Sequence, residues 1–428
     1  MITLTGLPDL SLMDSLVNLT VQGLTPGSRV TLKLAVQDDA QVTWQSQARF
    51  EISPEEGRMK LSRAQPEAGS YDRAHPMGLF WSMRPQREAG EGLVFQKRGL
   101  SPLEYRLEIE DEQGALLLER QFTRTLIDSD VVVEKLEASS GPGLAAEFYF
   151  KKGSDLKNHP LALIFGGSGG GMDFSRRAAA LLASRGIPSM ALAYFAYPGR
   201  PPLLAGIEIE YFEKALRWLK ARAGNDHAKI TVMGGSRGGE LSLILASLYP
   251  GEIHQVVARV PSHVVWAQGA PSWIYQGSPL CHVPMLALQE IQAEFEALRK
   301  KGGYLALTPL FEKAIRLMGQ QCQEAAIAVE KFNGRMLLIS GEDDQTWPSS
   351  WFSDRVVERM QAHGKGDQVR HLRYPNAGHG IPLPYFPATA HDMLHPVEKS
   401  GFKNGGTDEG DAFAAEDSWL QIRRFIES

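Results

Sequence analysis

The sequence predicts two domains of different class: an N-terminal antiparallel β-sandwich and a C-terminal α/β domain with a parallel sheet. Apolar and polar residues mostly alternate up to about residue 136, whereas apolar strands alternate with amphipathic helices after residue 140. The length of 428 residues also exceeds that of one average domain. The expected domains therefore span residues 1–136 and 140–428.

The alternation in the N-terminal part is clear in Val30–Val36 and in Tyr105–Ile109. Turn signals such as Thr25–Gly27 and Asp111–Gly114 separate the runs. Several short strands punctuated in this way predict a sandwich of immunoglobulin-like size, without the Cys-Trp-Cys pattern of a true immunoglobulin domain.

In the C-terminal part, six apolar runs are expected to form strands: 161–165, 189–193, 230–233, 256–260, 336–340 and 369–374. The segments 174–184, 211–221 and 240–247 have helical patterns, which predicts crossover helices between parallel strands. Residues 266–331 interrupt this rhythm. We expect them to form a cap over the carboxyl ends of the strands, where open α/β sheets bind ligands.

Composition and charge favour an enzyme that acts on a small molecule. The 45 basic and 50 acidic residues give a net charge of −5, which does not indicate a nucleic-acid partner. The N-terminus lacks the basic region of a signal peptide, and no apolar stretch is long enough for a membrane span, so a soluble cytoplasmic protein is expected. The two cysteines, Cys281 and Cys322, are expected to be reduced thiols.

The sharpest motif is Gly234-Gly-Ser236-Arg-Gly238, which stands between an expected strand and an expected helix. This setting is that of a nucleophile elbow, in which a strained turn presents the serine hydroxyl at the end of the sheet. The following helix N-terminus favours negative charge there. Ser236 is the candidate nucleophile, with an ordinary glycine-rich turn as the alternative.

A serine nucleophile needs a histidine base and an acid that orients it. Asp344 follows the strand at 336–340, and His379 follows the strand at 369–374, so their order and positions match the α/β-hydrolase arrangement. Glu342 and Asp343 are adjacent acids. We favour Asp344, four residues before Pro348, and a turn or capping carboxylate is the alternative role.

An oxyanion also needs backbone N–H donors. One is expected from Arg237, and the second from Gly167 or Ser168 in the glycine-rich loop 165–171. This loop lacks the spacing of a nucleotide-binding motif. His391 and His395 have a metal-like spacing but no third ligand follows, so we expect a pair on a helix surface, and no metal or cofactor.

Together these residues resemble the acyl-CoA thioesterase and bile acid-CoA:amino acid N-acyltransferase family. The most specific stretch is Gly69–Met83 in the N-terminal part. The likeness continues in Phe165–Gly171, Ala191–Phe195, Tyr211–Ala215, Gly235–Glu240, Gly341–Trp347, Gln361–Gly364, Gly378–His379 and Pro384–Pro387.

The resemblance implies a β-sandwich followed by an α/β-hydrolase domain, with the triad on Ser236, Asp344 and His379. It also implies hydrolysis of a fatty acyl-CoA, because the family's amino-acid transferases carry cysteine at the position of Ser236. A carboxylesterase acting on a non-CoA ester or amide and an N-acyltransferase are the alternatives. Phe80 and Trp81 are expected to pack between the domains, with a wall of the substrate pocket as the other possibility.

Overall fold

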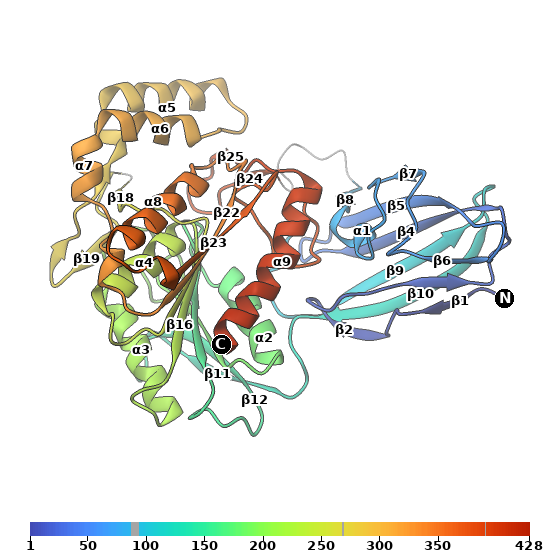
Figure 1. Ribbon diagram of the computed structural model, residues 1–428, viewed down its shortest axis with the longest axis horizontal. Helices are drawn as coiled ribbons and strands as arrows, with labels where there is room; N and C mark the ends of the chain where they lie inside the picture. Colours follow the sequence, from blue (N-terminus) through green and yellow to red (C-terminus); the bar gives the residue numbers. More distant parts are fainter. Residues whose placement is uncertain (87–93, 268, 390) are drawn as a thin grey trace.

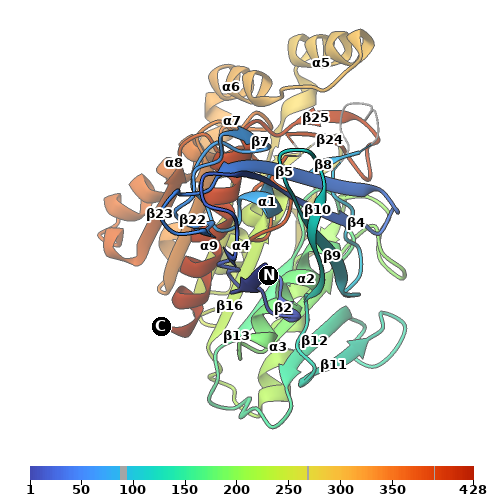
Figure 2. The same ribbon diagram turned by 90° about the vertical axis from the view of Figure 1, so that its right-hand side faces the viewer.

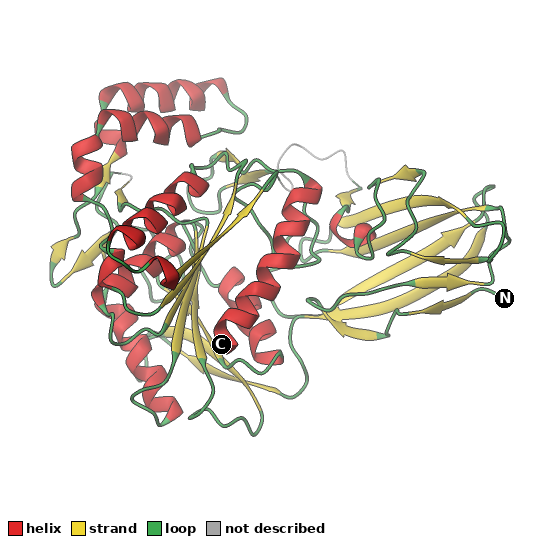
Figure 3. Ribbon diagram, in the orientation of Figure 1, coloured by secondary structure: helices red, strands yellow, loops and turns green. Residues whose placement is uncertain are grey.

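The computed structural model describes residues 1–86, 94–267, 269–389 and 391–428. A β-sandwich forms one end of the molecule and an α/β domain the other (Figure 1). Helices are confined almost entirely to the second domain (Figure 3). Both expected fold classes are therefore confirmed.

In the sandwich, strands β1, β3 and β6 form one sheet, and the order β2-β10-β9-β4-β5-β7 forms the other, with β8 paired to β5. Side chains of β4 alternate between buried and half-buried positions along the strand, as the sequence pattern requires of a sheet with one covered face. The strands are β1 (Thr3–Thr5), β2 (Leu10–Leu12), β3 (Thr20–Gln22), β4 (Arg29–Gln37), β5 (Thr43–Glu51), β6 (Arg58–Lys60), β7 (Ala68–Gly69), β8 (Arg84–Pro85), β9 (Leu103–Glu110) and β10 (Leu116–Thr125).

The second domain is built on an eight-stranded sheet of order β11-β12-β14-β13-β16-β17-β22-β23. Its strands are β11 (Val131–Leu136), β12 (Ala145–Lys151), β13 (Leu161–Phe165), β14 (Ser189–Ala193), β16 (Ile230–Gly235), β17 (Gln255–Arg259), β22 (Arg335–Gly341) and β23 (Val369–Tyr374). From β14 to β23 all neighbours are parallel, and β13, β16 and β17 are buried on both faces, so their sequences are continuous apolar runs.

Helices cover both faces of this sheet. On one face lie α3 (Glu210–Ala223), α4 (Arg237–Leu248) and α8 (Ser349–Ala362). On the other lie α2 (Asp173–Ser184) and α9 (Asp408–Glu427), which also face the sandwich (Figure 1). The buried side chains of α2, α9 and the sandwich form one continuous apolar cluster, so the two domains share a core.

β11 lies before the expected domain boundary at residue 136, but it joins the sheet of the α/β domain. Val131–Leu136 pairs antiparallel with β12, from Val131 opposite Lys151 to Leu136 opposite Ala146, and so belongs to the second sheet. The alternating sequence of β11 resembles that of the sandwich strands because it is an edge strand with exposed side chains. The chain therefore passes directly from the sandwich into the sheet of the α/β domain.

A buried carboxylate joins the domains at a second place. The side chain of Asp14 is fully buried, and Oδ1 accepts a hydrogen bond from Nη2 of Arg185 at 2.6 Å. Its Oδ2 accepts from Nε1 of Trp419, in α9, at 3.0 Å. In Figure 2, where the sandwich faces the viewer, α2 and α9 lie behind it. The ion pair between Asp14 and Arg185 thus fixes the sandwich against the helical layer.

The signature aromatics Phe80 and Trp81 lie in α1 (Gly78–Trp81) and are buried. Phe80 packs against Tyr105 inside the sandwich, with ring centroids 5.6 Å apart. The carbonyl of Trp81 accepts a hydrogen bond from the N–H of Ala388 at 2.8 Å, so Trp81 joins the two domains. Neither residue is among the described residues that line the cavity around Ser236.

The expected cap stands over the carboxyl ends of the strands (Figure 1). Its elements are β18 (Trp266–Ala267), β19 (Trp273–Tyr275), β20 (Ser278–Pro279), β21 (Val283–Pro284), α5 (Gln289–Lys301), α6 (Thr308–Leu317) and α7 (Gly319–Glu324). β19 pairs in parallel with the short strand β15 (Ile207–Glu208), which anchors the cap to the domain beneath it. A hairpin of β24 (Asp392–Leu394) and β25 (Gly401–Lys403) lies beside the site.

Candidate active site

Ser236 stands at the tight turn between β16 and α4, with φ 58° and ψ −122°. This positive φ is costly for a residue with a side chain and is typical of a nucleophile elbow. The neighbouring glycines make the turn possible, since a Cβ on Gly234 would lie 2.3 Å from the carbonyl oxygen of Gly238. A hydrogen bond from the N–H of Ser236 to the carbonyl of Arg259, 2.9 Å long, holds the turn on the end of β17.

His379 and Asp344 form a hydrogen-bonded pair. Nδ1 of His379 is 2.8 Å from Oδ2 of Asp344, and both side chains are largely buried. The other oxygen of Asp344 accepts hydrogen bonds from the N–H groups of Thr346 and Trp347, at 3.0 and 3.1 Å. The carboxylate is thus fixed from the far side, and it holds the proton of His379 on Nδ1. This leaves Nε2 of His379 to act as a base.

The adjacent acids have other partners. Oδ2 of Asp343 accepts from the N–H of Gly406 at 2.9 Å. Glu342 forms a surface ion pair with Arg373. Asp344 alone of the three contacts the ring of His379.

The glycine-rich loop lies against the nucleophile. A Cβ on Gly167 would be 3.2 Å from Cβ of Ser236 and 2.6 Å from the carbonyl oxygen of Gly235. In the described part of the chain, the N–H groups of Gly167, Ser168 and Arg237 donate to no other group. These donors are therefore free to bind an oxyanion beside Ser236.

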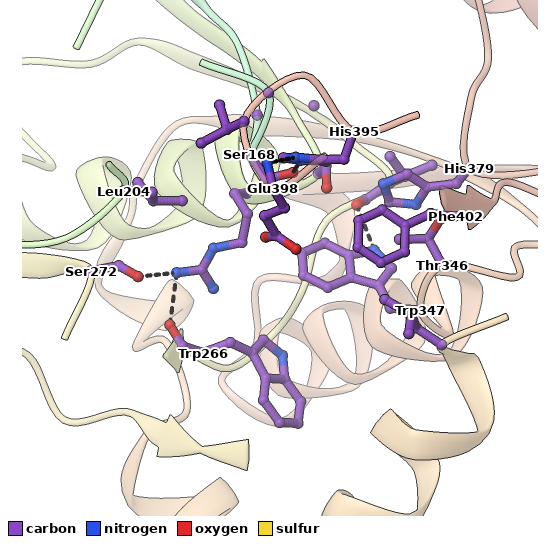
Figure 4. A pocket seen from close by; sticks show the side chains of 18 of the residues that line it. Ser168, Leu204, Trp266, Ser272, Thr346, Trp347, His379, His395, Glu398 and Phe402 are labelled. Carbon is purple, nitrogen blue, oxygen red and sulfur yellow. Dashed lines mark hydrogen bonds between the residues drawn. The ribbon is translucent and has the colours of Figure 1, made fainter. Parts of the chain in front are cut away.

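His395 supports this loop, contrary to the expectation from sequence. Its Nδ1 accepts from the N–H of Glu398 at 3.1 Å, so the proton lies on Nε2, which donates to Oγ of Ser168 at 3.0 Å (Figure 4). Burial lowers the pKa of His395 to about 4, which keeps the ring neutral. The partners are 227 residues apart, and no sequence signal connects them.

The expected helix-surface pair of His391 and His395 is wrong, because β24 separates the two residues. Nε2 of His391 is 2.7 Å from Oδ1 of Asp408, and Asp411 lies 3.3 Å from Nδ1. Asp408 and Asp411 raise the pKa of His391 to about 10. No cluster of potential metal ligands occurs among the described residues.

The side chain of Arg237 ties the elbow to the cap. Its Nη1 pairs with the buried Glu240 at 2.6 Å, while Nη2 donates to Oγ of Ser272 and to the carbonyl of Trp266, each at 2.7 Å (Figure 4). Burial raises the pKa of Glu240 to about 7, an effect that Arg237 opposes. One residue thus offers an N–H to the site and anchors the cap above it.

A cavity of about 660 Å³ contains Ser236, His379, Gly167, Ser168 and Arg237 among its lining residues. Figure 4 shows side chains from the cap, the β24–β25 hairpin and the sheet ends converging on it. Most of its wall is apolar: Phe174, Phe195, Leu203, Leu204, Val260, Trp266, Met285, Phe295, Leu307, Phe311, Trp347, Ile381, Met393 and Phe402. The size and lining suit a small molecule with an apolar chain.

Comparison with known proteins agrees with this architecture. The family description "Acyl-CoA thioester hydrolase/BAAT N-terminal region" matches residues 14–138, and "BAAT / Acyl-CoA thioester hydrolase C terminal" matches residues 207–428. The chain belongs to this family. Within the described residues, no helix is long and apolar enough to cross a membrane.

Named relatives of the family align along nearly the whole chain. Acyl-coenzyme A thioesterase 1 of Rattus norvegicus is 28% identical over 97% of this chain and 94% of its own length. Acyl-coenzyme A thioesterase 1 of Homo sapiens is 28% identical, with 96% and 93% covered. Acyl-coenzyme A amino acid N-acyltransferase 1 of Mus musculus is 30% identical, with 100% and 97% covered.

Proposed function

We propose that this protein is a serine thioesterase that hydrolyses acyl-CoA to a free carboxylic acid and CoA. The observation that carries the proposal is the joint position of Ser236, the His379–Asp344 pair and the free N–H groups on one apolar cavity. Relatives named as acyl-CoA thioesterases that align over nearly the whole chain support the thioester as substrate.

In the proposed mechanism, Nε2 of His379 takes the proton of Ser236 while Oγ attacks the thioester carbon. Asp344 stabilises the imidazolium that results. The N–H groups of Arg237 and of the Gly167 loop hold the oxyanion. His379 then protonates the leaving sulfur, and CoA departs from the acyl-serine.

Water completes the cycle. His379, again neutral, takes a proton from a water molecule as its oxygen attacks the acyl-serine carbonyl, and the same N–H groups hold the second oxyanion. Collapse of this intermediate returns the proton to Ser236 and releases the acid. The apolar cavity wall holds the acyl chain in place through both steps.

The test is release of the CoA thiol from a series of acyl-CoAs, with nitrophenyl esters of the same acids in parallel. Thiol release by the wild-type protein that is lost in Ser236→Ala supports the proposal. Ser247→Ala, in α4 but outside the described cavity lining, is the matched control and should retain activity. Ester hydrolysis without thiol release would refute CoA as the leaving group and favour a carboxylesterase.

The mouse N-acyltransferase relative gives a second candidate, transfer of the acyl group to an amino acid. The same assay with added glycine or taurine distinguishes it. Hydrolysis gives a free acid with or without the amine, whereas transfer gives an N-acyl product that mass spectrometry detects. We favour hydrolysis because this chain has Ser236 at the nucleophile position. The family resemblance implies cysteine at that position in the amino-acid transferases.

A further inference from the structure

The N-terminus of α9 packs against the loop that carries His379, and the proposed mechanism does not account for this contact. The N–H of Thr407, just before α9, donates to the carbonyl of Asn376 at 2.8 Å. The N–H of Gly378 donates to Oδ1 of Asp411 at 2.8 Å. Asn376 has φ 58°, a conformation that asparagine tolerates better than most residues. The turn before His379 is therefore held from outside by α9.

Two glycines allow this close approach. A Cβ on Gly406 would lie 2.5 Å from the backbone N of Gly378 and 2.8 Å from each carboxylate oxygen of Asp411. A Cβ on Gly410 would lie 2.1 Å from the carbonyl oxygen of Asn376. Non-bonded atoms do not approach this closely, so a larger residue at either position would push α9 away from the loop. The sequence is thus fitted to a short distance between α9 and the loop.

Asp411 is a buried carboxylate outside the triad, and it is 3% exposed. Burial raises its pKa, while His391 and the N–H of Gly378 oppose that effect. Nδ1 of His391 lies 3.3 Å from Oδ2 of Asp411, and Nε2 lies 2.7 Å from Oδ1 of Asp408. Asp408 also pairs with Arg84 of the sandwich at 2.6 Å. The protonated ring of His391 thus supplies a counter-charge for Asp411.

His391 also holds the segment on the other side of the loop. Its Nδ1 lies 3.1 Å from the carbonyl oxygen of Gly405. Its carbonyl accepts from the N–H of Asn404 at 2.6 Å, and the carbonyl of Asn404 accepts from the N–H of His379 at 2.8 Å. The N–H of His379 and that of the preceding Gly378 are therefore both fixed by residues that contact His391.

We propose that Asp411 is a positioning residue for His379, which it holds in place through the N–H of Gly378, with the nearby imidazolium as its counter-ion. The bond from Asp344 to Nδ1 orients the ring but does not fix the backbone from which the ring projects. A displacement of the loop by about 1 Å would change the distance from Nε2 to Oγ of Ser236, and such errors lower catalytic rates about a hundredfold. The inference rests on the triad of the proposed function and not on the identity of the substrate.

The test uses a fluorophosphonate, which needs no CoA substrate. Oγ of Ser236 attacks the phosphorus, fluoride leaves, and the proton of Ser236 passes to His379. Mass spectrometry of the intact protein at several probe concentrations gives the maximal labelling rate and the half-saturating concentration separately. In Asp411→Ala the maximal rate should fall about tenfold or more, with an unchanged half-saturating concentration. Asp411→Asn should recover most of the rate, because its amide oxygen can still accept from the N–H of Gly378.

Two variants control for a general loss of stability. Asp14→Ala removes another buried carboxylate, whose partners Arg185 and Trp419 are outside the described cavity lining. Arg73→Met breaks the exposed ion pair between the sandwich and Glu409 of α9. Both variants should keep the wild-type labelling rate at a temperature where circular dichroism shows them folded.

An unchanged maximal rate in Asp411→Ala would overturn the inference. An equal loss in Asp14→Ala would also overturn it, because the effect would then be one of general stability. An equal loss in Asp411→Asn would exclude the bond to Gly378 as the cause. If Asp411→Ala does not fold, His391→Leu takes its place with His391→Gln as the conservative partner, and the same fall in rate alone is expected. An unchanged rate in His391→Leu would then overturn the inference.

Failure of this inference and failure of the thioesterase function are distinguishable. Labelling that depends on Asp411, without thiol release from any acyl-CoA, would refute only the thioesterase. Thiol release together with labelling that is independent of Asp411 would refute only the positioning role.

Discussion

Replacement of Asp344 by asparagine gives a sharp prediction, because the structure fixes how the new amide must lie. The N–H groups of Thr346 and Trp347 donate to Oδ1 of Asp344. The amide oxygen takes that place, so the amide NH2 faces Nδ1 of His379. Reversing the amide would lose two hydrogen bonds, at about 1 kcal/mol each.

An amide donor at this position forces the proton of His379 from Nδ1 onto Nε2. The ring then cannot accept the proton of Ser236, and no carboxylate stabilises the imidazolium. We expect kcat to fall by about 10⁴, equal to about 5.5 kcal/mol in the barrier, while the fold is retained. The assay is thiol release from acyl-CoA, with circular dichroism to verify folding.

The matched control is Asp343→Asn, since Asp343 binds the N–H of Gly406 and does not contact His379. This variant should keep most of its activity. The reasoning is refuted if Asp344→Asn keeps more than about a tenth of the wild-type rate, or if the control loses as much.

Three further predictions concern groups around the site. His395→Leu removes the donor to Ser168 and should lower kcat on a nitrophenyl ester about tenfold with little change in KM. The pKa of His391 in the folded protein, about 10, exceeds the unfolded value of about 6.5, so the protonated ring stabilises the fold. This stabilisation is complete below about pH 6.5 and is lost as the pH rises to about 10. The thermal midpoint should fall over that range, and less steeply in His391→Gln. Arg237→Met leaves the buried Glu240 without its cation and should cost about 3 kcal/mol in urea unfolding, part of which Glu240→Gln restores.

A different result would contradict each of these three predictions. A rise in KM alone in the His395 variant would mean that the ring shapes the acyl site rather than the oxyanion loop. If the thermal midpoint falls equally steeply with pH in wild type and His391→Gln, His391 does not contribute to the pH dependence of stability. A double variant at Arg237 and Glu240 no more stable than Arg237→Met would show that the two charges are not coupled.

The sequence allowed the main features of the fold and the site to be predicted where local patterns carry the information. Buried parallel strands are mostly apolar, so β13 and β14 were located at their observed bounds. Ser236, Asp344 and His379 follow strand ends, and the carboxyl ends of parallel strands meet at one edge of the sheet. The order of strands and helices therefore predicted that these three residues lie close together.

Features that depend on distant contacts could not be found in this way. The alternation in β11 is that of any half-exposed strand, and only its pairing with β12 shows which sheet it joins. The bond between His395 and Ser168 depends on how the β24–β25 hairpin folds back. Arg259 ends an apolar run, and nothing in its sequence neighbours indicates that its guanidinium is buried and donates to the carbonyl of Ile381.

The direct passage of the chain from the sandwich into β11 also limits how the two domains can move. A flexible linker would let the sandwich move as a lid. Here the chain leaves β10 at Thr125 and enters β11 at Val131, and all six residues of β11 pair with β12. Asp14, next to Met13 whose N–H donates to the carbonyl of Thr125 at the end of β10, fastens the sandwich to Arg185 close to this crossing. Rotation of the sandwich relative to the α/β domain would break both attachments and expose the shared core. The sandwich therefore holds α2 and α9 in a fixed position behind the site.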